Sequence, residues 1–414
     1  MNIRILQCAW LVLYLGHCGV SAATETPETA QEATWRRELQ FLQSRELRDP
    51  ADYHAPTALA VAYIQHAQLT GDVSFYAKAE ERVKASIAIE KANLEAMLVL
   101  AQVYSAQHRF KESIELADKV MIAKPMDPPS LGVKGDAQLN LGDLAGAEKT
   151  YAELKKVEDG FYYQSRDANL KYMKGDTQGA IATLKEALEV APSSMPASIA
   201  WCNVQIGQLY FMSGQFDQAK EFYAAALVAI PGYAPALDHQ AELFAARENY
   251  GEAEKIYKEL IEKSPRPDLQ QALGDMYLYR GMKDEAKKWH TLAADAYTKS
   301  VDAGNFHYAH HLAGFYCDSQ ENPAEALKWA KKDFEMRQSC YAYDTLAWAL
   351  YKNGDYAGAA ERITQALASG VKDAHLYFHG GVIYARAGDF ARSKTCTQQA
   401  LEINPMFEKF HVHR

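Results

Sequence analysis

Histidine is the residue type whose spacing in this chain comes closest to a chemical site. His307, His310 and His311 lie together, and His375 and His379 repeat the four-residue spacing of His307 and His311. Two histidines four residues apart share a face of a helix and can chelate zinc or copper. Neither group has a full ligand set within its own segment, and two ligands alone make a weak site. We therefore expect surface or groove histidines, with no metal centre and no cofactor.

Catalytic motifs give no second candidate. The sequence has no phosphate-binding P-loop, no nucleophile elbow and no HExxH zinc motif. Its carboxylates are plentiful but spread along the chain, as on solvated helix faces. We expect that the protein is not an enzyme and that no residue is catalytic.

Length and composition indicate a large globular protein. The chain has 414 residues, 48% of them hydrophobic and 23% charged, which is a folded rather than a disordered balance. This length exceeds one ordinary hydrophobic core, so several domains or a repeat array are expected. The formal net charge is −9 and no stretch is densely basic, which disfavours a nucleic-acid partner.

The first 23 residues have the layout of a secretory signal peptide. A short positive region ends at Arg4, an apolar run follows, and small residues at 20–23 suit cleavage after Ala22 or Ala23. The run is too short to span a bilayer comfortably. We expect an exported protein, periplasmic or extracellular, with no integral membrane span after cleavage. A lipoprotein modified at Cys18 is the lesser alternative, because His17 is a poor neighbour for that signal.

Four cysteines remain after that cleavage. Cys202, Cys317, Cys340 and Cys396 are widely spaced and form no CxxC pattern. We expect buried free thiols on helices. A disulfide in an oxidising compartment stays open as an alternative.

Repetition with a period of 34 residues dominates the rest of the chain. The clearest pairs at this spacing are Ala219 with Ala253, Tyr223 with Tyr257, and Pro231 with Pro265. Related Gly, Ala, Tyr and Pro positions continue in both directions. A period of this length is typical of stacked helical repeats.

The repeat resembles the tetratricopeptide repeat (TPR) motif. Gly207 and Tyr210 match its first helix, and Ala219, Tyr223 and Pro231 match its second helix and its end. The resemblance covers about ten units from roughly residue 52 to 407 and implies an all-α fold, a right-handed superhelical solenoid of about ten TPR helix pairs. Glycines such as those in the Gly-Asp pairs are expected to end the first helices, and the following Asp to start the second helices. The pairs are Gly142-Asp143, Gly175-Asp176, Gly354-Asp355 and Gly388-Asp389.

The expected organisation has five parts. These are the signal peptide (1–23), a partly flexible N-terminal segment (24–51), two parts of the TPR array (52–306 and 307–407) and a tail (408–414). A helix through Trp35 is expected to lead the array. The array is divided because residues 287–304 read as an extended second helix without a closing proline, with Gly304 as its cap.

The resemblance also implies a binding surface, because the first helix of each TPR unit lines the concave side. Those positions carry mostly aromatic residues, Asp and Gln. The candidate groove residues are Trp201, Phe211, Tyr308, His311, Phe315, Tyr341, Trp348, Tyr351 and Phe378. Similar positions hold Gln208, Asp268, Gln271, Asp275, Leu278, Asp318, Asp344, His375 and Val382. Exposed aromatic rings with polar rims suit peptide binding. A register shift of one residue would turn a helix by about 100° and place some of these rings in the core.

The function expected from this resemblance is that of a protein- or peptide-binding scaffold of the bacterial envelope. The alternative is a structural accessory subunit of a secretion or polysaccharide-export machine. An enzyme on a TPR fold is disfavoured because the repeats leave little room for a catalytic domain. The partner is expected to be a protein or peptide and not a nucleic acid, and the oligomeric state stays open.

Overall fold

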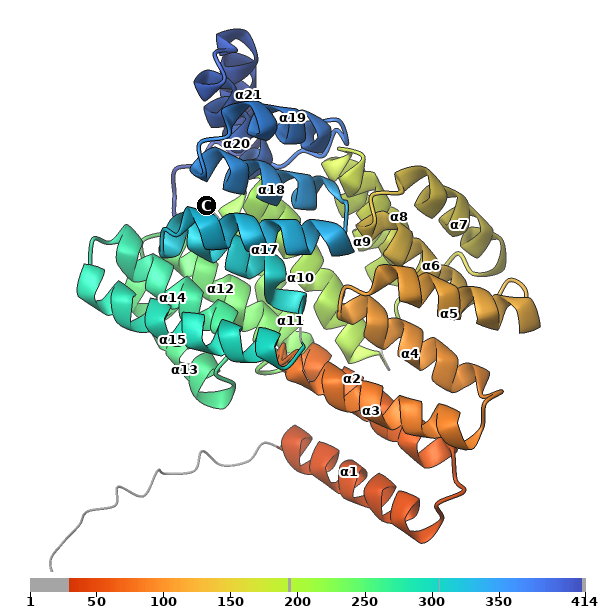
Figure 1. Ribbon diagram of the computed structural model, residues 1–414. Coiled ribbons are helices and arrows are strands. Elements are labelled where there is room, and N and C mark those ends of the chain that lie inside the picture. Colours follow the sequence, from red (N-terminus) through yellow and green to blue (C-terminus); the bar gives the residue numbers. More distant parts are fainter. Residues whose placement is uncertain (1–29, 193–194, 305, 412–414) are drawn as a thin grey trace, which may run out of the picture.

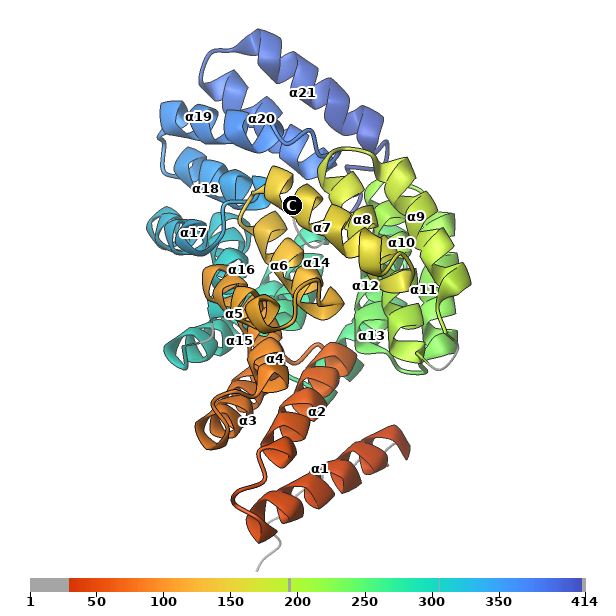
Figure 2. The ribbon, with the colours of Figure 1, turned by 90° about the vertical axis from the view of Figure 1, so that its right-hand side faces the viewer.

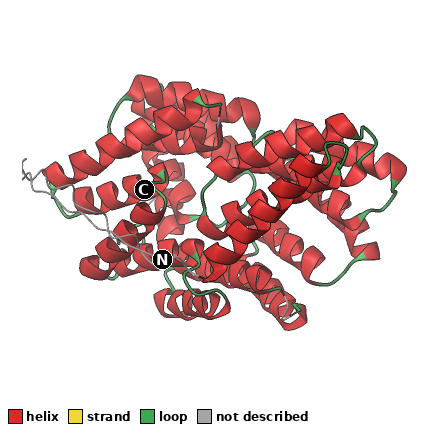
Figure 3. Ribbon diagram, turned by 90° about the horizontal axis from the view of Figure 1, so that it is seen from below, coloured by secondary structure: helices red, strands yellow, loops and turns green. Residues whose placement is uncertain are grey.

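The computed structural model describes residues 30–192, 195–304 and 306–411, and every regular element within these ranges is a helix (Figures 1 and 3). The expected signal peptide lies outside the described residues. No helix in the described ranges is long and apolar enough to cross a membrane.

The helices form a leading helix and ten consecutive pairs. The leading helix is α1 (Ala30–Arg48). The first five pairs are α2 (His54–Thr70) with α3 (Ser74–Ile89), α4 (Leu94–Ala106) with α5 (Phe110–Ala123), α6 (Pro128–Asn140) with α7 (Leu144–Val157), α8 (Phe161–Met173) with α9 (Thr177–Val190), and α10 (Pro196–Met212) with α11 (Phe216–Ala229). The last five are α12 (Ala234–Ala246) with α13 (Tyr250–Lys263), α14 (Pro267–Tyr279) with α15 (Lys283–Asp302), α16 (Ala309–Gly314) with α17 (Pro323–Met336), α18 (Cys340–Lys352) with α19 (Tyr356–Leu367), and α20 (Ala374–Arg386) with α21 (Phe390–Ile403). The all-α solenoid and the number of pairs expected from the sequence are confirmed over the described residues.

Glycine and aspartate set the turn within a pair. Gly142 has a φ of 82°, in the left-handed region that a glycine adopts without strain. The next residue, Asp143, accepts a hydrogen bond of 2.9 Å from the backbone N–H of Gly146 and so begins α7. The Gly-Asp pairs before α9, α19 and α21 do the same, as predicted.

Small residues in the first helix make room for tyrosines of the second. A side chain at Gly135 would overlap the ring of Tyr151, and one at Gly207 would overlap the ring of Tyr223. Both rings are almost completely buried. The Gly/Ala and Tyr positions of the repeat therefore correspond to one close helix contact.

Two local expectations are also confirmed. The second helix α15 is extended to 20 residues, and Gly304 follows it with a φ of 84°. The leading helix α1 packs on α2, where the ring of Trp35 stacks on His66 at a centroid distance of 3.7 Å.

The four cysteines of the described residues are buried free thiols, as expected, and none of them forms a disulfide in this structure. They are Cys202, Cys317, Cys340 and Cys396.

Helices far apart in the sequence come into contact where the superhelix passes over itself, a feature that the repeat pattern did not predict. We call α2–α11 the first turn and α12–α21 the second turn. Figure 2 shows α4 and α5 in front of α15 and α16, and a contact of 3.2 Å between His307 Nδ1 and the carbonyl of Ala106, 201 residues apart, places these turns side by side. Tyr172 and Tyr341 form another bridge through their hydroxyl groups at 2.8 Å.

Two glycines in the loops between paired helices of the first turn lie at the contact with the second turn. A side chain at Gly142 would meet the carbonyl of Gln338, and one at Gly175 would meet the carbonyl of Gly370. These glycines are needed both for their left-handed backbone and for the close approach of the second turn.

Candidate functional site

A cavity lies between the first helices of the last six pairs. It has a volume of about 640 Å³ and is lined by residues of α10, α12, α14, α16, α18 and α20. We call it the inner cavity. Because the first helix of each pair faces the superhelix axis, the second turn supplies most of its wall, and α10 of the first turn supplies the rest.

Several predicted groove residues line the inner cavity. Of the nine candidates, Phe211, His311, Tyr341 and Trp348 do so. Of the polar residues expected at similar positions, Asp268 does not line it. The others do, namely Gln208, Gln271, Asp275, Asp318, Asp344 and His375. The structure therefore brings residues from several helices to one surface, as the first-helix positions indicated.

Tyr308 and Phe315 are corrections, because they are core residues. Their exposed fractions are 4% and 0%, and both rings pack around Tyr297 of α15. The reason is a change of helical register. A 3-10 turn (Phe306–Tyr308) precedes α16 and a π-helical turn (Phe315–Ser319) follows it, so a regular 3.6-residue spacing fails in this unit.

The remaining candidates lie away from the cavity wall. Trp201 is exposed on α10, and Phe378 is exposed on α20 beside Phe407 at a ring distance of 5.1 Å. Tyr351 stacks on Trp348 at 4.8 Å without lining the cavity.

The sequence left open whether Trp348 is a groove residue or a core residue. In the structure its side chain lines the cavity and is also packed against neighbouring rings. Its ring is half-buried and stacks on His379 at 4.0 Å. Its indole Nε1–H donates a hydrogen bond of 3.0 Å to Oδ2 of Asp318. These contacts hold the ring in one orientation.

The wall of the inner cavity is acidic. Its described residues include five carboxylates and a single guanidinium, that of Arg337, together with six histidines. The carboxylates are Glu242, Asp275, Asp318, Asp344 and Asp373. Burial raises the pKa of the Asp318 and Asp373 carboxyls, although Lys352 at 2.9 Å opposes this shift for Asp318. A cationic guest would find both aromatic faces and carboxylates here.

His379 is the histidine most closely tied to this acidic wall. Its Nδ1 lies 2.9 Å from Oδ1 of Asp344. Burial disfavours the charged ring, but the Asp344 carboxylate outweighs it and raises the pKa of His379 above 6.5. The contact between His379 and Asp344 therefore links α20 to α18.

This pair predicts a pH dependence of stability. Because the pKa of His379 is raised in the folded protein, the pair contributes stability that is fully present below the unfolded pKa of about 6.5 and is lost as pH rises through the folded pKa. In Asp344→Asn this loss between acidic and alkaline pH should shrink, while the exposed control Asp302→Asn should retain it. Urea unfolding across this pH range measures the effect, and identical pH profiles of both variants would contradict it.

The chain after α21 completes the ring around the inner cavity. The hydroxyl of Tyr279 donates a hydrogen bond of 3.3 Å to the carbonyl of Glu408, and Lys409 pairs with Glu248 at 2.5 Å. Phe410 is buried in the core of α12–α14, and His411 lines the cavity. This segment ties the end of the second turn back to its beginning.

Some cavity residues were missed from the sequence. Glu242 had a usable signal, because it stands 34 residues after Gln208 at the same repeat position. No such signal marked His239 on α12, Arg337 after α17 or Asp373 before α20, because these positions carry no repeat signature. The closing segment was also missed, since it follows the last repeat and has no pattern of its own.

Comparison with known proteins identifies the repeats on which this site is built. A family model described as tetratricopeptide repeat matches residues 204–268 and 345–393, which include most of the cavity-lining parts of α10, α12, α18 and α20. These stretches are tetratricopeptide repeats. The TPR units therefore supply a large part of the inner cavity, and TPR proteins generally act as scaffolds for protein partners.

Individual relatives are distant. The Arabidopsis thaliana protein NPGR2 is 25% identical over 247 residues, 54% of this chain, and the chain spans 31% of the length of that relative. Among solved structures, a thermophilic TPR protein of Thermus thermophilus has 18% identity and a TM-score of 0.39, covering 49% of this chain and 98% of its own. Yeast Tom70 has 14% identity and a TM-score of 0.39, covering 84% of this chain and 85% of its own.

Proposed function

We propose that the protein is a TPR scaffold of the bacterial envelope whose inner cavity holds an extended, basic segment of a protein partner. The observation that supports this proposal is the inner cavity, in which five carboxylates and several aromatic rings surround about 640 Å³. Binding sites that bury most of a drug-sized ligand have volumes of about 300–1,000 Å³. A few residues of an extended peptide fit this range.

The chemistry of the wall favours lysine or arginine side chains in that segment. Trp348 and Tyr341 of α18 line the cavity, together with Asp344 of the same helix and Asp318 of the preceding unit. A guanidinium or ammonium group gains charge-assisted hydrogen bonds from such carboxylates and cation–π contacts from the rings. The partner is therefore a protein or peptide, in keeping with an acidic chain that disfavours nucleic acid.

The experiment is a selection of random decapeptides on the protein, followed by fluorescence anisotropy with the selected peptides. We expect enrichment of Lys and Arg. Glu242→Gln should weaken binding about tenfold or more, because a hydrogen bond to a charged group contributes about 1.5–3 kcal/mol. Glu252→Gln on the exposed side of α13 is the matched control and should bind normally. Selected peptides without basic residues, or equal affinities of the two variants, would overturn the proposal.

The envelope location rests on the N-terminal layout of residues 1–23. We expect the mature protein to begin at Ala23 or Thr24. Edman sequencing of protein purified from its native cell fractions measures this. A cytosolic protein that retains Met1 would contradict export while leaving peptide binding untouched.

A second candidate role is that of a structural accessory subunit in a secretion or polysaccharide-export machine. The stacked turns favour it, because they make a rigid body whose second helices expose apolar side chains such as Ile122 and Val228. In that role the partner would contact the outer surface, and substitutions in the inner cavity would leave assembly unchanged.

A further inference from the structure

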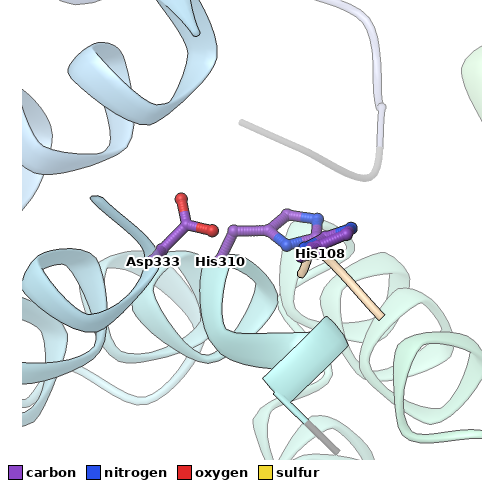
Figure 4. Close-up of side chains that lie close together, drawn as sticks. All are labelled: His108, His310 and Asp333. Carbon is purple, nitrogen blue, oxygen red and sulfur yellow. The ribbon is translucent and has the colours of Figure 1, made fainter. Parts of the chain in front are cut away.

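Three side chains from both turns of the superhelix converge on one point (Figure 4). His108 lies in the turn between α4 and α5, His310 in α16 and Asp333 in α17. One possible ligand atom of each lies within 4.8 Å of those of the other two. We call these residues the His–His–Asp cluster.

The cluster contains an unusual concentration of polar atoms without partners. Nδ1 of His108, Nδ1 of His310 and Oδ2 of Asp333 are each buried and form no hydrogen bond. An unsatisfied buried polar group costs free energy, so several at one point need a physical explanation. A shared cation would satisfy all three.

The backbone at His108 supports the same explanation. His108 has a φ of 62°, and it ends the first helix of its pair where Gly71 and Gly142 end theirs. A non-glycine residue in this left-handed conformation is strained, and such strain often accompanies function. Glu248, with a φ of 61°, is the other described non-glycine residue that ends a first helix in this left-handed conformation. It also contacts a distant segment, because it pairs with Lys409.

We propose that His108, His310 and Asp333 bind a zinc ion that joins the two turns of the superhelix. Two imidazoles and one carboxylate are a ligand set that Zn²⁺ accepts, with water in the fourth position. Zinc ligands at bond lengths of about 2.0–2.2 Å lie roughly 3.4 Å apart in a tetrahedron. The ligand atoms of the cluster, up to 4.8 Å apart, would draw together by up to about 1.4 Å to reach this geometry.

The surroundings prepare the three ligands. Nε of Arg337 donates a hydrogen bond of 2.7 Å to Oδ1 of Asp333, which orients the carboxylate and leaves Oδ2 for the ion. Nδ1 of His108 and Nδ1 of His310 form no hydrogen bond, so both nitrogens are available to the ion.

This site differs from the pairs that the sequence offered. His307 and His311 share a helix spacing, but Nδ1 of His307 is engaged with the carbonyl of Ala106. The third ligand had no local signal, because His108 comes from the other turn of the superhelix. The sequence therefore offered only histidines that are close together along the chain, and His108 is not one of them.

The test uses chelator-treated full-length protein, titrated with ZnCl₂ in a calorimeter and with Co²⁺ as a visible probe of tetrahedral coordination. We expect one equivalent of Zn²⁺ to bind and to raise the melting temperature. His108→Gly should abolish both effects. This variant should fold well, because glycine fills the same turn in neighbouring units.

Matched variants complete the experiment. Asp333→Asn should weaken Zn²⁺ binding about tenfold or more, whereas His54→Ala, at an exposed histidine, should leave it unchanged. No Zn²⁺ binding by the unmodified protein would overturn the proposal. So would full binding by His108→Gly, which would place the ion elsewhere, for example at His375 and His411, whose rings are 4.0 Å apart.

Discussion

Replacing Gly175 by alanine is expected to lower the free energy of unfolding by about 2–5 kcal/mol, the sum of a left-handed alanine and an overpacked contact. Gly175 has a φ of 87°, and an added Cβ would press on the carbonyl oxygen of Gly370. That carbonyl is backbone and belongs to the other turn, so relief requires the turns to separate.

Gly354→Ala is the matched control for this effect. Gly354 has nearly the same backbone, with a φ of 82°, but nothing lies within 4 Å of an added Cβ. It should cost only the conformational part, about 1–2 kcal/mol. Urea unfolding of both variants, with small-angle scattering of the folded forms, measures the difference. Equal losses and equal dimensions would show that the turns do not support each other.

Replacing Trp348 by alanine is expected to cost about 2–4 kcal/mol, slightly less than the 3–5 kcal/mol of a fully buried aromatic ring. The ring is half-buried against Tyr351 and His379, and its indole N–H supports the buried carboxylate of Asp318. Its removal leaves a cavity and takes a donor from that carboxylate.

Two further variants separate the contributions to this loss of stability. Trp348→Phe keeps most of the stacking but lacks the indole donor, so it should retain much of the stability. Trp201→Ala, at a tryptophan that is 38% exposed, should change stability by about 0.5 kcal/mol or less. Thermal unfolding compares them. A loss at position 201 as large as at 348 would refute the placement of Trp348 in a packed wall.

Residues that recur every 34 positions could be placed from the sequence because each repeat reuses one geometry. The fully buried tyrosines such as Tyr223 and Tyr257 follow from this rule, and the Gly-Asp turns recur at a similar spacing. Gln208 and Asp275 were placed on first helices, and both line the inner cavity. In these units the helix begins and ends at the expected residues, so a repeat position fixes a direction in space.

Two parts of the structure lie beyond this rule. Between residues 306 and 319 the helix changes from 3-10 to α to π form, and this change turned Tyr308 and Phe315 into the core. The contact between turns depends on small rotations that accumulate over five pairs. No single repeat encodes that sum, so the pairing of Gly175 with Gly370, and the meeting of His108 with His310, required the structure.

Binding of a basic peptide in the inner cavity is the central claim, and site-specific photo-crosslinking tests it most directly. Leu278 on α14 lines the cavity and is 39% exposed, whereas Leu292 on α15 is 48% exposed and lies outside the cavity lining. A photoreactive benzoylphenylalanine at either position should be tolerated, because both side chains already reach solvent. With a selected basic decapeptide, we expect a cross-link from position 278 and none from position 292. A cross-link from position 292 alone would place the partner on the outer surface and contradict the account.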